Sequence, residues 1–248
     1  MMRASIVAGL CSLALGPAHA DGMSDLKAAL ARLKGQASLH AVLDTRTTRR
    51  LGDGPEDQGQ ASVILDDGSH GLQVTYPRET AARMAREVAA RGRDPNAKAP
   101  TAAALREVDA IDLLQLASAV GAIERALAGA VFKGERPDNR GGKAVRLLSF
   151  AMPIETLSER DRKYAKSLDA SYDIWIDSDG TPLASRLHQV IGGRAFIVVG
   201  FDTRYDELCT YQQSGDRLLV LRKESSSSAS GAGERDERKT ITTLRPEA

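Results

Sequence analysis

The sequence predicts an α+β fold: a strongly curved antiparallel sheet, or incomplete β-barrel, with helices packed on one face or as a lid. Two observations support this class. Alternating apolar and polar residues recur in long segments separated by short turn signals, which is the pattern of antiparallel strands. A segment of helical periodicity, from about residue 78 to 129, is inserted between the first strands and the rest.

The amino-terminal segment predicts export. Arg3 precedes an apolar run over residues 4–15, and Ala18 and Ala20 stand at the two recognition positions of a signal-peptidase site. We therefore expect cleavage after Ala20, a periplasmic or secreted location, and a single domain over residues 21–248. No later segment approaches the roughly 20 apolar residues that a membrane-spanning helix needs, so no membrane span is expected.

Composition argues against several classes of partner. The chain has 34 Lys and Arg against 33 Asp and Glu, and only 4% of its residues are aromatic. A balanced charge gives no long-range attraction to nucleic acid, and so few aromatic side chains provide no stacking platform for bases. Cys209 is the only cysteine beyond the expected signal, so no intramolecular disulfide is predicted.

A short amphipathic helix and a strand are expected first. Ser24 can cap the helix, which ends near Gly35. Residues 37–45 then alternate as a strand with one apolar side, and a polar stretch over residues 46–58 interrupts the pattern.

The clearest predicted hairpin follows. Asp67-Gly68 is typical of a two-residue type I′ turn, because glycine tolerates the positive φ that this turn requires. Counting outward from the turn gives one apolar face and one polar face. The expected apolar pairs are Val63 with Leu72 and Ala61 with Val74.

Helical periodicity occupies the middle of the chain. Residues 78–91 form a predicted helix that ends at Gly92, and its apolar stripe is Ala81, Met84, Ala85 and Val88. A second helical region begins near Thr101 and continues to Leu127, with a break near Asp109.

Strands return after residue 131. Two runs, 131–136 and 143–151, flank a turn, and Ser158 resembles the start of a capping box that opens a short helix. A meander of long strands follows, with expected turns at Asp179-Gly180, Gly192-Gly193 and Ser214-Gly215.

These three turns determine the expected pairing of the meander. The turn at Asp179-Gly180 pairs Tyr172 with Leu187, Ile174 with Ser185 and Asp173 with Arg186. The turn at Gly192-Gly193 places Val198 beside Leu187 and Phe196 beside Gln189. The turn at Ser214-Gly215 pairs Glu207 with Arg222 and Asp206 with Lys223. A Ser/Gly tract over residues 225–236 is too polar to bury much apolar surface, so a mobile loop is expected there. Residues 238–245 can return as a final, charged edge strand.

A sheet whose central strands are apolar on both sides needs two covers. The helices can supply one. The other side either closes on a filled core or curls around an apolar ligand. In the second case the ligand-binding residues are the apolar side chains of the inner face: Leu39, Leu43, Val63, Leu72, Val74, Tyr76, Tyr172, Ile174, Leu187, Phe196 and Val198. In the first case the same residues are ordinary core.

The chain resembles the periplasmic lipoprotein carrier superfamily of the LolA/LolB type. The resemblance rests on the order of the elements, on the segment DLKAALARL at 25–33, on the Asp-Gly hairpin and on the strand YDIWIDSDGTPLA at 172–184, and it covers most of the mature chain as a pattern. It implies an incomplete barrel, lidded by helices, that holds acyl chains and passes them between partners.

The chain departs from this family at one point. The best-known carriers have a basic residue directly before the proline that ends an early strand, whereas here Tyr76 precedes Pro77 and Arg78 follows it. The family's opening mechanism is therefore not implied for this chain.

Motifs for metal binding and catalysis are weak. Asp177 and Asp179 resemble part of a calcium loop, but Trp175 stands where such a loop needs an oxygen ligand. Neither a metal nor another cofactor is expected.

Two catalytic arrangements can also be considered. Ser171, His188 and Asp173 share one predicted sheet face, where side chains do not converge on one imidazole. Cys209 lies in mid-strand, opposite Val220 in the predicted register, with no histidine near it. The chain is therefore not expected to be an enzyme.

We expect an exported carrier or binding protein for a lipid, a lipoprotein acyl chain or another hydrophobic molecule, with envelope proteins as further partners. Two alternatives stay open: an envelope assembly protein with a filled core, and an enzyme of unrecognised type that uses the cavity. A carrier should have a lining almost free of charge, and an enzyme should have ionisable side chains of perturbed pKa that converge in the pocket. An assembly protein should have no cavity and an exposed apolar patch.

Overall fold

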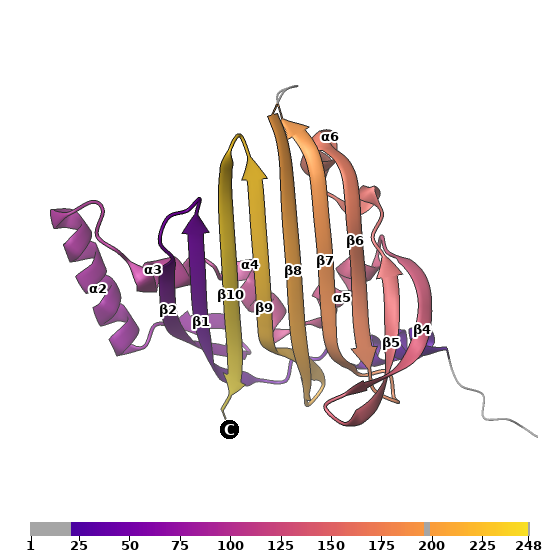
Figure 1. Ribbon diagram of the computed structural model, residues 1–248. Helices are drawn as coiled ribbons and strands as arrows, with labels where there is room; N and C mark the ends of the chain where they lie inside the picture. Colours follow the sequence, from indigo (N-terminus) through magenta and orange to yellow (C-terminus); the bar gives the residue numbers. More distant parts are fainter. Residues whose placement is uncertain (1–20, 196–198, 248) are drawn as a thin grey trace, which may run out of the picture.

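A single antiparallel sheet of ten strands forms the body of the protein (Figure 1). The computed structural model describes residues 21–195 and 199–247. The sheet is curved and open, with strand order β3-β2-β1-β10-β9-β8-β7-β6-β5-β4, so β3 and β4 are its edges. The predicted α+β class is confirmed. The expected signal peptide, Phe196 and Val198 lie outside the described residues.

The strands are β1 (Leu39–Leu51), β2 (Asp57–Gly68), β3 (Gly71–Thr75), β4 (Val131–Arg140), β5 (Lys143–Ala151), β6 (Ala165–Ile176), β7 (Pro182–Ala195), β8 (Val199–Ser214), β9 (Arg217–Gly231) and β10 (Glu234–Pro246). The helices are α1 (Gly22–Arg32), α2 (Arg78–Arg93), α3 (Pro100–Leu105), α4 (Ala110–Ala117), α5 (Val120–Leu127) and α6 (Glu159–Tyr164), with a 3-10 turn at η1 (Ile154–Thr156).

The helices lie on one face of the sheet. In Figure 1, α1, α3, α4 and α5 lie behind the strands, and α2 projects beyond the β2 edge. We call this side the covered face and the other side the open face, over which no helix of the described residues lies. The core lies between the helices and the covered face. Its fully buried side chains include Leu26, Leu33, Leu148, Ile174, Leu218 and Leu244.

Short polar side chains begin three of the helices. Asp109 precedes α4 and accepts a hydrogen bond from the backbone N–H of Asp112, and Ser158 does the same for α6. The predicted break at Asp109 and the capping box at Ser158 are confirmed. Helix α1 begins earlier than expected, because Asp21 and not Ser24 is its cap.

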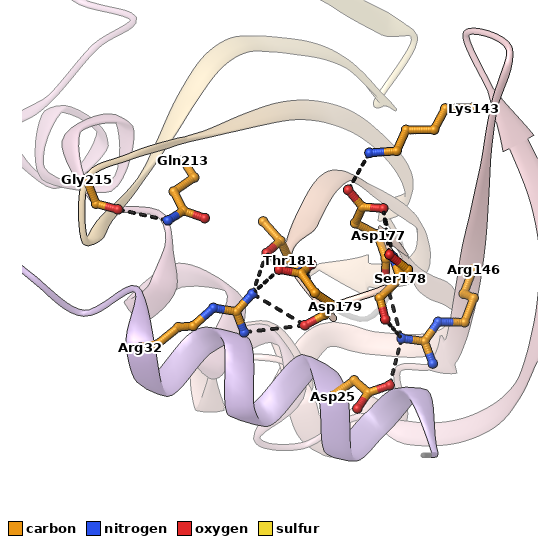
Figure 2. A network of polar contacts seen from close by, with 10 residues as sticks. All are labelled: Asp25, Arg32, Lys143, Arg146, Asp177, Ser178, Asp179, Thr181, Gln213 and Gly215. Carbon is orange, nitrogen blue, oxygen red and sulfur yellow. Dashed lines mark hydrogen bonds and ion pairs between the residues drawn. The ribbon is translucent and has the colours of Figure 1, made fainter. Parts of the chain in front are cut away.

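A polar network holds α1 against the turn between β6 and β7 (Figure 2). Arg32 donates to the Asp179 carboxylate, and Arg146 pairs with Asp25 at 2.7 Å. Gly180 in this turn has φ +84°, and an added Cβ would lie 2.2 Å from the carbonyl oxygen of Asp25. The turn therefore requires glycine both for its conformation and for the close approach of the helix.

The hairpin between β6 and β7 has the predicted register. Tyr172 pairs with Leu187, Ile174 with Ser185 and Asp173 with Arg186. These pairings are confirmed.

The predicted turn at Gly192-Gly193 is wrong. Both glycines lie inside β7, opposite Asp202 and Phe201. An added Cβ at Gly193 would lie 2.3 Å from the Phe201 ring and 2.5 Å from the Tyr164 carbonyl oxygen, so here glycine makes room for its neighbours. The true partners are Glu207 for Leu187 and Tyr205 for Gln189.

The turn predicted at Asp67-Gly68 is displaced. The chain turns at residues 69–70, so that Leu65 pairs with Val74 and Gly68 with Gly71. The Asp67 carboxylate is instead 2.6 Å from Arg217, which keeps Asp67 within the strand. The displacement leaves the same side chains on each face, because it is an even number of residues.

The turn predicted at Ser214-Gly215 is also displaced, by one residue. Ser214 pairs with Arg217, and a bulge follows between Thr210 and Tyr211. The expected pairs of the third turn are therefore wrong: Glu207 lies opposite Ser225, Asp206 opposite Ser226, and Cys209 opposite Lys223.

The Ser/Gly tract is strand and not the expected loop. Residues 225–231 belong to β9 and pair with both β8 and β10. The backbone N–H and C=O groups of this segment form hydrogen bonds with the strands on both sides, although its side chains bury little apolar surface. The chain turns only at residues 232–233, where both φ angles are positive. The final strand is also not at an edge, because β10 lies between β9 and β1.

Polar contacts hold α2 against β2 and α3, and its predicted apolar stripe does not pack against the rest of the protein. Val88 is 71% exposed. The hydroxyl of Thr80 donates to the carbonyl of Ser62 on β2, and the Glu87 carboxylate accepts from the backbone N–H of Thr101 at the start of α3. The helix therefore turns its polar side, and not its alanine stripe, towards the protein.

Candidate ligand-binding site

Two adjoining chambers lie between the helices and the covered face. The apolar chamber, about 190 Å³, is bounded by α4, α5 and strands β6–β9. The polar chamber, about 250 Å³, is bounded by α4, the segment before it and strands β8–β10. Asp112, Leu116 and Lys223 border both chambers, so the two meet at these residues.

The apolar chamber is open because the side chains on its helix side, which we call its roof, are small. Its floor contains Tyr172 and Leu187 from neighbouring strands. Its roof contains Ala119, Ala122 and Ala126, which reach less far towards the sheet than longer residues would. The result is a gap between two layers that elsewhere pack as core.

Ionisable side chains gather where the chambers meet. Lys223 Nζ is 2.5 Å from Asp112 Oδ1 and 3.6 Å from Glu207 Oε2. Tyr205 donates its hydroxyl to Glu207 at 2.6 Å, and Cys209 Sγ is 3.7 Å from the same carboxylate. Residues 205, 207 and 209 of β8 share the covered face because side chains two apart point the same way.

Burial governs the protonation of this cluster. Burial, with the neighbouring Glu207 carboxylate, raises the pKa of the Cys209 thiol well above its usual range. Burial opposes the charge of Lys223, but Glu207 and Asp112 outweigh it and raise the pKa of the ammonium. Burial also raises the pKa of Tyr172 to about 12. At neutral pH, Cys209 is therefore a thiol and Lys223 an ammonium.

The polar chamber combines a second ion pair with hydroxyl groups. Arg238 Nη1 is 3.0 Å from Glu107 Oε2. The strands supply four serine and threonine hydroxyls to its walls, those of Ser225, Ser227, Thr240 and Thr242. This chamber is suited to hydrogen bonding more than to an apolar ligand.

The structure distributes the predicted ligand-binding residues over several places. Tyr172 and Leu187 line the apolar chamber. Leu43, Val63, Val74 and Tyr76 border a separate pocket of only about 40 Å³ near β1–β3. Leu39, Leu72 and Ile174 border none of these cavities: Leu39 and Ile174 are buried in the core, and Leu72 packs against it.

A lining almost free of charge was the criterion for a carrier, and the apolar chamber does not meet it. Glu207, Lys223 and Asp112 all border the apolar chamber. The incorrect register of β8 and β9 hid this cluster in the sequence, because it placed Glu207 and Lys223 opposite other partners. Their contact is diagonal across the two strands and becomes visible only with the true pairing.

The motifs considered for metal binding and catalysis have structural partners. Lys143 pairs with Asp177, and Arg32 with Asp179 (Figure 2). The Nδ1 atom of His188 is 2.7 Å from Asp206, so Asp173 does not complete a triad with it. In residues 21–195 and 199–247, no group of three His, Cys, Asp or Glu side chains is arranged to hold a metal ion.

The hollows of the open face are larger but shallow. They measure about 450 and 570 Å³ and are lined by charged side chains, including Arg204, Asp206 and Lys239. Such troughs provide no apolar enclosure. Among the described helices, none has the length and apolar character to cross a membrane.

Comparison with known proteins identifies two structural neighbours. No family model and no curated protein matches the chain. The LolA superfamily protein NE2245 from Nitrosomonas europaea aligns over 92% of this chain and 96% of its own, with 13% identity and a TM-score of 0.28. MucB in complex with MucA(peri) aligns over 92% and 98%, with 9% identity and a TM-score of 0.22. Function has to be argued from this chain's own residues.

Proposed function

We propose that this protein is an exported binding or carrier protein that holds a lipid, a lipoprotein acyl chain or another hydrophobic molecule under α4 and α5. The apolar chamber carries this proposal. It offers about 190 Å³ of space above Tyr172 and Leu187. Well-packed protein interiors contain few voids larger than a water molecule, so a gap of this size between two layers supports occupation by a ligand.

Apolar walls are sufficient for affinity. Burying each methylene of an alkyl chain contributes about 0.8 kcal/mol, and no reactive group is required. The apolar chamber alone is smaller than the roughly 300–1,000 Å³ of typical small-molecule sites. A long chain would therefore need α4 and α5, each eight residues long, to move outward as a lid.

The chemistry of the cluster favours binding over catalysis. The pKa values of the Tyr205 hydroxyl and the Cys209 thiol are both raised, mainly by burial, so neither group is an activated nucleophile. The two chambers likewise argue against an assembly protein with a filled core. The amino-terminal export signal expected from the sequence supports a periplasmic or secreted location, with envelope proteins as donors or acceptors of the ligand.

Native mass spectrometry and organic extraction of protein purified from an envelope fraction test this proposal. We expect a lipid in near-stoichiometric amount. Leu187→Asp should abolish its retention, because it places a carboxyl group in the floor of the apolar chamber. Leu208→Asp, on the open face of the neighbouring strand, should retain it. A wild-type protein free of lipid that takes up no fluorescent fatty acid would contradict the proposal.

A further inference from the structure

The two chambers are connected, and together they indicate which chemical class of ligand the protein binds. This inference about the ligand rests on the proposed function. Each chamber alone is below the usual size of a ligand site of about 300–1,000 Å³, whereas the two together fall within it. A ligand that fills both must pass Lys223 and Leu116, with apolar walls on one side and polar walls on the other. Such a ligand is an amphiphile.

The charges of the polar chamber are already paired. Arg238 contacts Glu107 at 3.0 Å, and Lys223 contacts Asp112 at 2.5 Å. A charged headgroup would either break one of these pairs or stay unpaired in a partly buried space, and both are unfavourable. The chamber therefore favours a headgroup without net charge.

Three hydroxyl groups of the same chamber are unused by the protein. Ser225, Ser227 and Thr242 line it, and Thr242 is only 3% exposed. Within the part of the chain that the structure describes, none of these three hydroxyls makes a hydrogen bond to another protein group. Thr242 is buried, Ser225 is half-buried and Ser227 is exposed, and all three hydroxyls are available to a ligand that both donates and accepts hydrogen bonds.

We infer that the ligand is a single-chain amphiphile with an uncharged, hydroxyl-bearing headgroup, of the class of glycerol monoesters and alkyl glycosides. Its chain lies in the apolar chamber, and its headgroup lies against Ser225, Ser227 and Thr242. Successive serines of β9 point to opposite faces of the sheet. Ser225 and Ser227 face the helices, whereas Ser226 and Ser228 face the open side. This alternation provides a matched control on one strand.

Isothermal titration calorimetry with 1-decanoylglycerol, decanoate and decylammonium, each below its aggregation concentration, tests the inference. We expect 1-decanoylglycerol to bind at least about tenfold more tightly than either charged compound, as two hydrogen bonds of ordinary net strength would provide. Ser225→Ala combined with Thr242→Val should remove most of this preference. Ser226→Ala combined with Ser228→Ala should leave it unchanged. Thermal unfolding followed by circular dichroism verifies that both double variants are folded.

The outcomes separate this inference from the proposed function. If none of the decyl compounds binds and the purified protein carries no lipid, the proposed function fails. If all three bind equally, or a charged one binds best, the protein still binds apolar chains, but the inference about the headgroup is overturned. An equal loss of preference in both double variants would also overturn it.

Discussion

The covered and open faces of the sheet are formed by alternate residues of the same strands, yet they present different chemistry. Neighbouring residues of β8 show the contrast. Glu207 contacts Lys223 beneath α4, whereas Asp206 contacts His188 and Arg204 on the open face. Their side chains are almost equally exposed, 23% and 22%. The difference between the faces therefore lies in the helices above them and not in the polarity of the strands.

The covered face is itself divided. Near the start of β9, Val220 is buried and lines the apolar chamber. Further along the same strand, Lys223, Ser225 and Ser227 line the chambers. The interior thus changes from packed hydrocarbon to hydrogen-bonding groups along one strand, which is the arrangement that an amphiphile requires.

The largest expected effect is at Arg217, beneath the end of α4. It is 2% exposed and donates to Asp67 at 2.6 Å and to the carbonyl of Ala117. Arg217→Ala leaves a carboxylate without its cation and should lower the free energy of unfolding by about 3–5 kcal/mol. Arg222, on the open face of the same strand, pairs with Glu224 at the surface, so Arg222→Ala should cost less than about 1 kcal/mol. Urea unfolding measures both, and equal costs would remove the distinction between the faces.

A smaller effect is expected at the adjacent carboxylates. Glu207→Gln weakens the contacts of Lys223 and Tyr205 under the helices and should cost about 1–2 kcal/mol. Asp206→Asn acts on a cluster that no described helix covers and whose partner Arg204 is 58% exposed, so it should cost less than about 1 kcal/mol. Chemical denaturation of the two variants measures the loss in the free energy of unfolding at each of these neighbouring positions. A larger cost for Asp206→Asn would show that the open-face cluster is the more important of the two.

The last expected effect depends on pH. Burial raises the pKa of Tyr172 to about 12, whereas a tyrosine of the unfolded chain has a pKa of about 10. The unfolded chain then loses this proton first, so the stability that neutral Tyr172 contributes is present below pH 10 and is lost as the pH rises towards 12. Tyr172→Phe should flatten part of the fall in Tm over this range. An unchanged profile would mean that Tyr172 is accessible to water.

Local signals predicted some features of the fold and missed others for identifiable reasons. The hairpin at Asp179-Gly180 was predictable because the turn needs a positive φ and because Asp173 and Arg186 lie opposite each other. The pair Gly192-Gly193 had the same appearance but another role. Glycine serves both in turns and where a neighbour approaches closely, and the ring of Phe201 lies too far along the sequence to distinguish them.

The same limit applies to the site. Tyr172 and Leu187 were predictable as inner-face residues because they alternate with polar ones around a readable turn. Lys223 and Glu207 were not, because their contact depends on a bulge between Thr210 and Tyr211 that shifts the pairing of β8 and β9. The bulge also places Val220 and Lys223, which are three residues apart, on the same face, and the alternation of β9 alone does not predict this.

The sequence by itself determined the α+β class, the long antiparallel strands, the break before α4 and the capped start of α6, because these depend on periodicity and on groups a few residues apart. Only the tertiary structure decided that the serine tract is a strand, which face the helices cover and where space is left beneath them. Those features depend on backbone pairing and side-chain volumes between segments far apart in the chain, which no local pattern records.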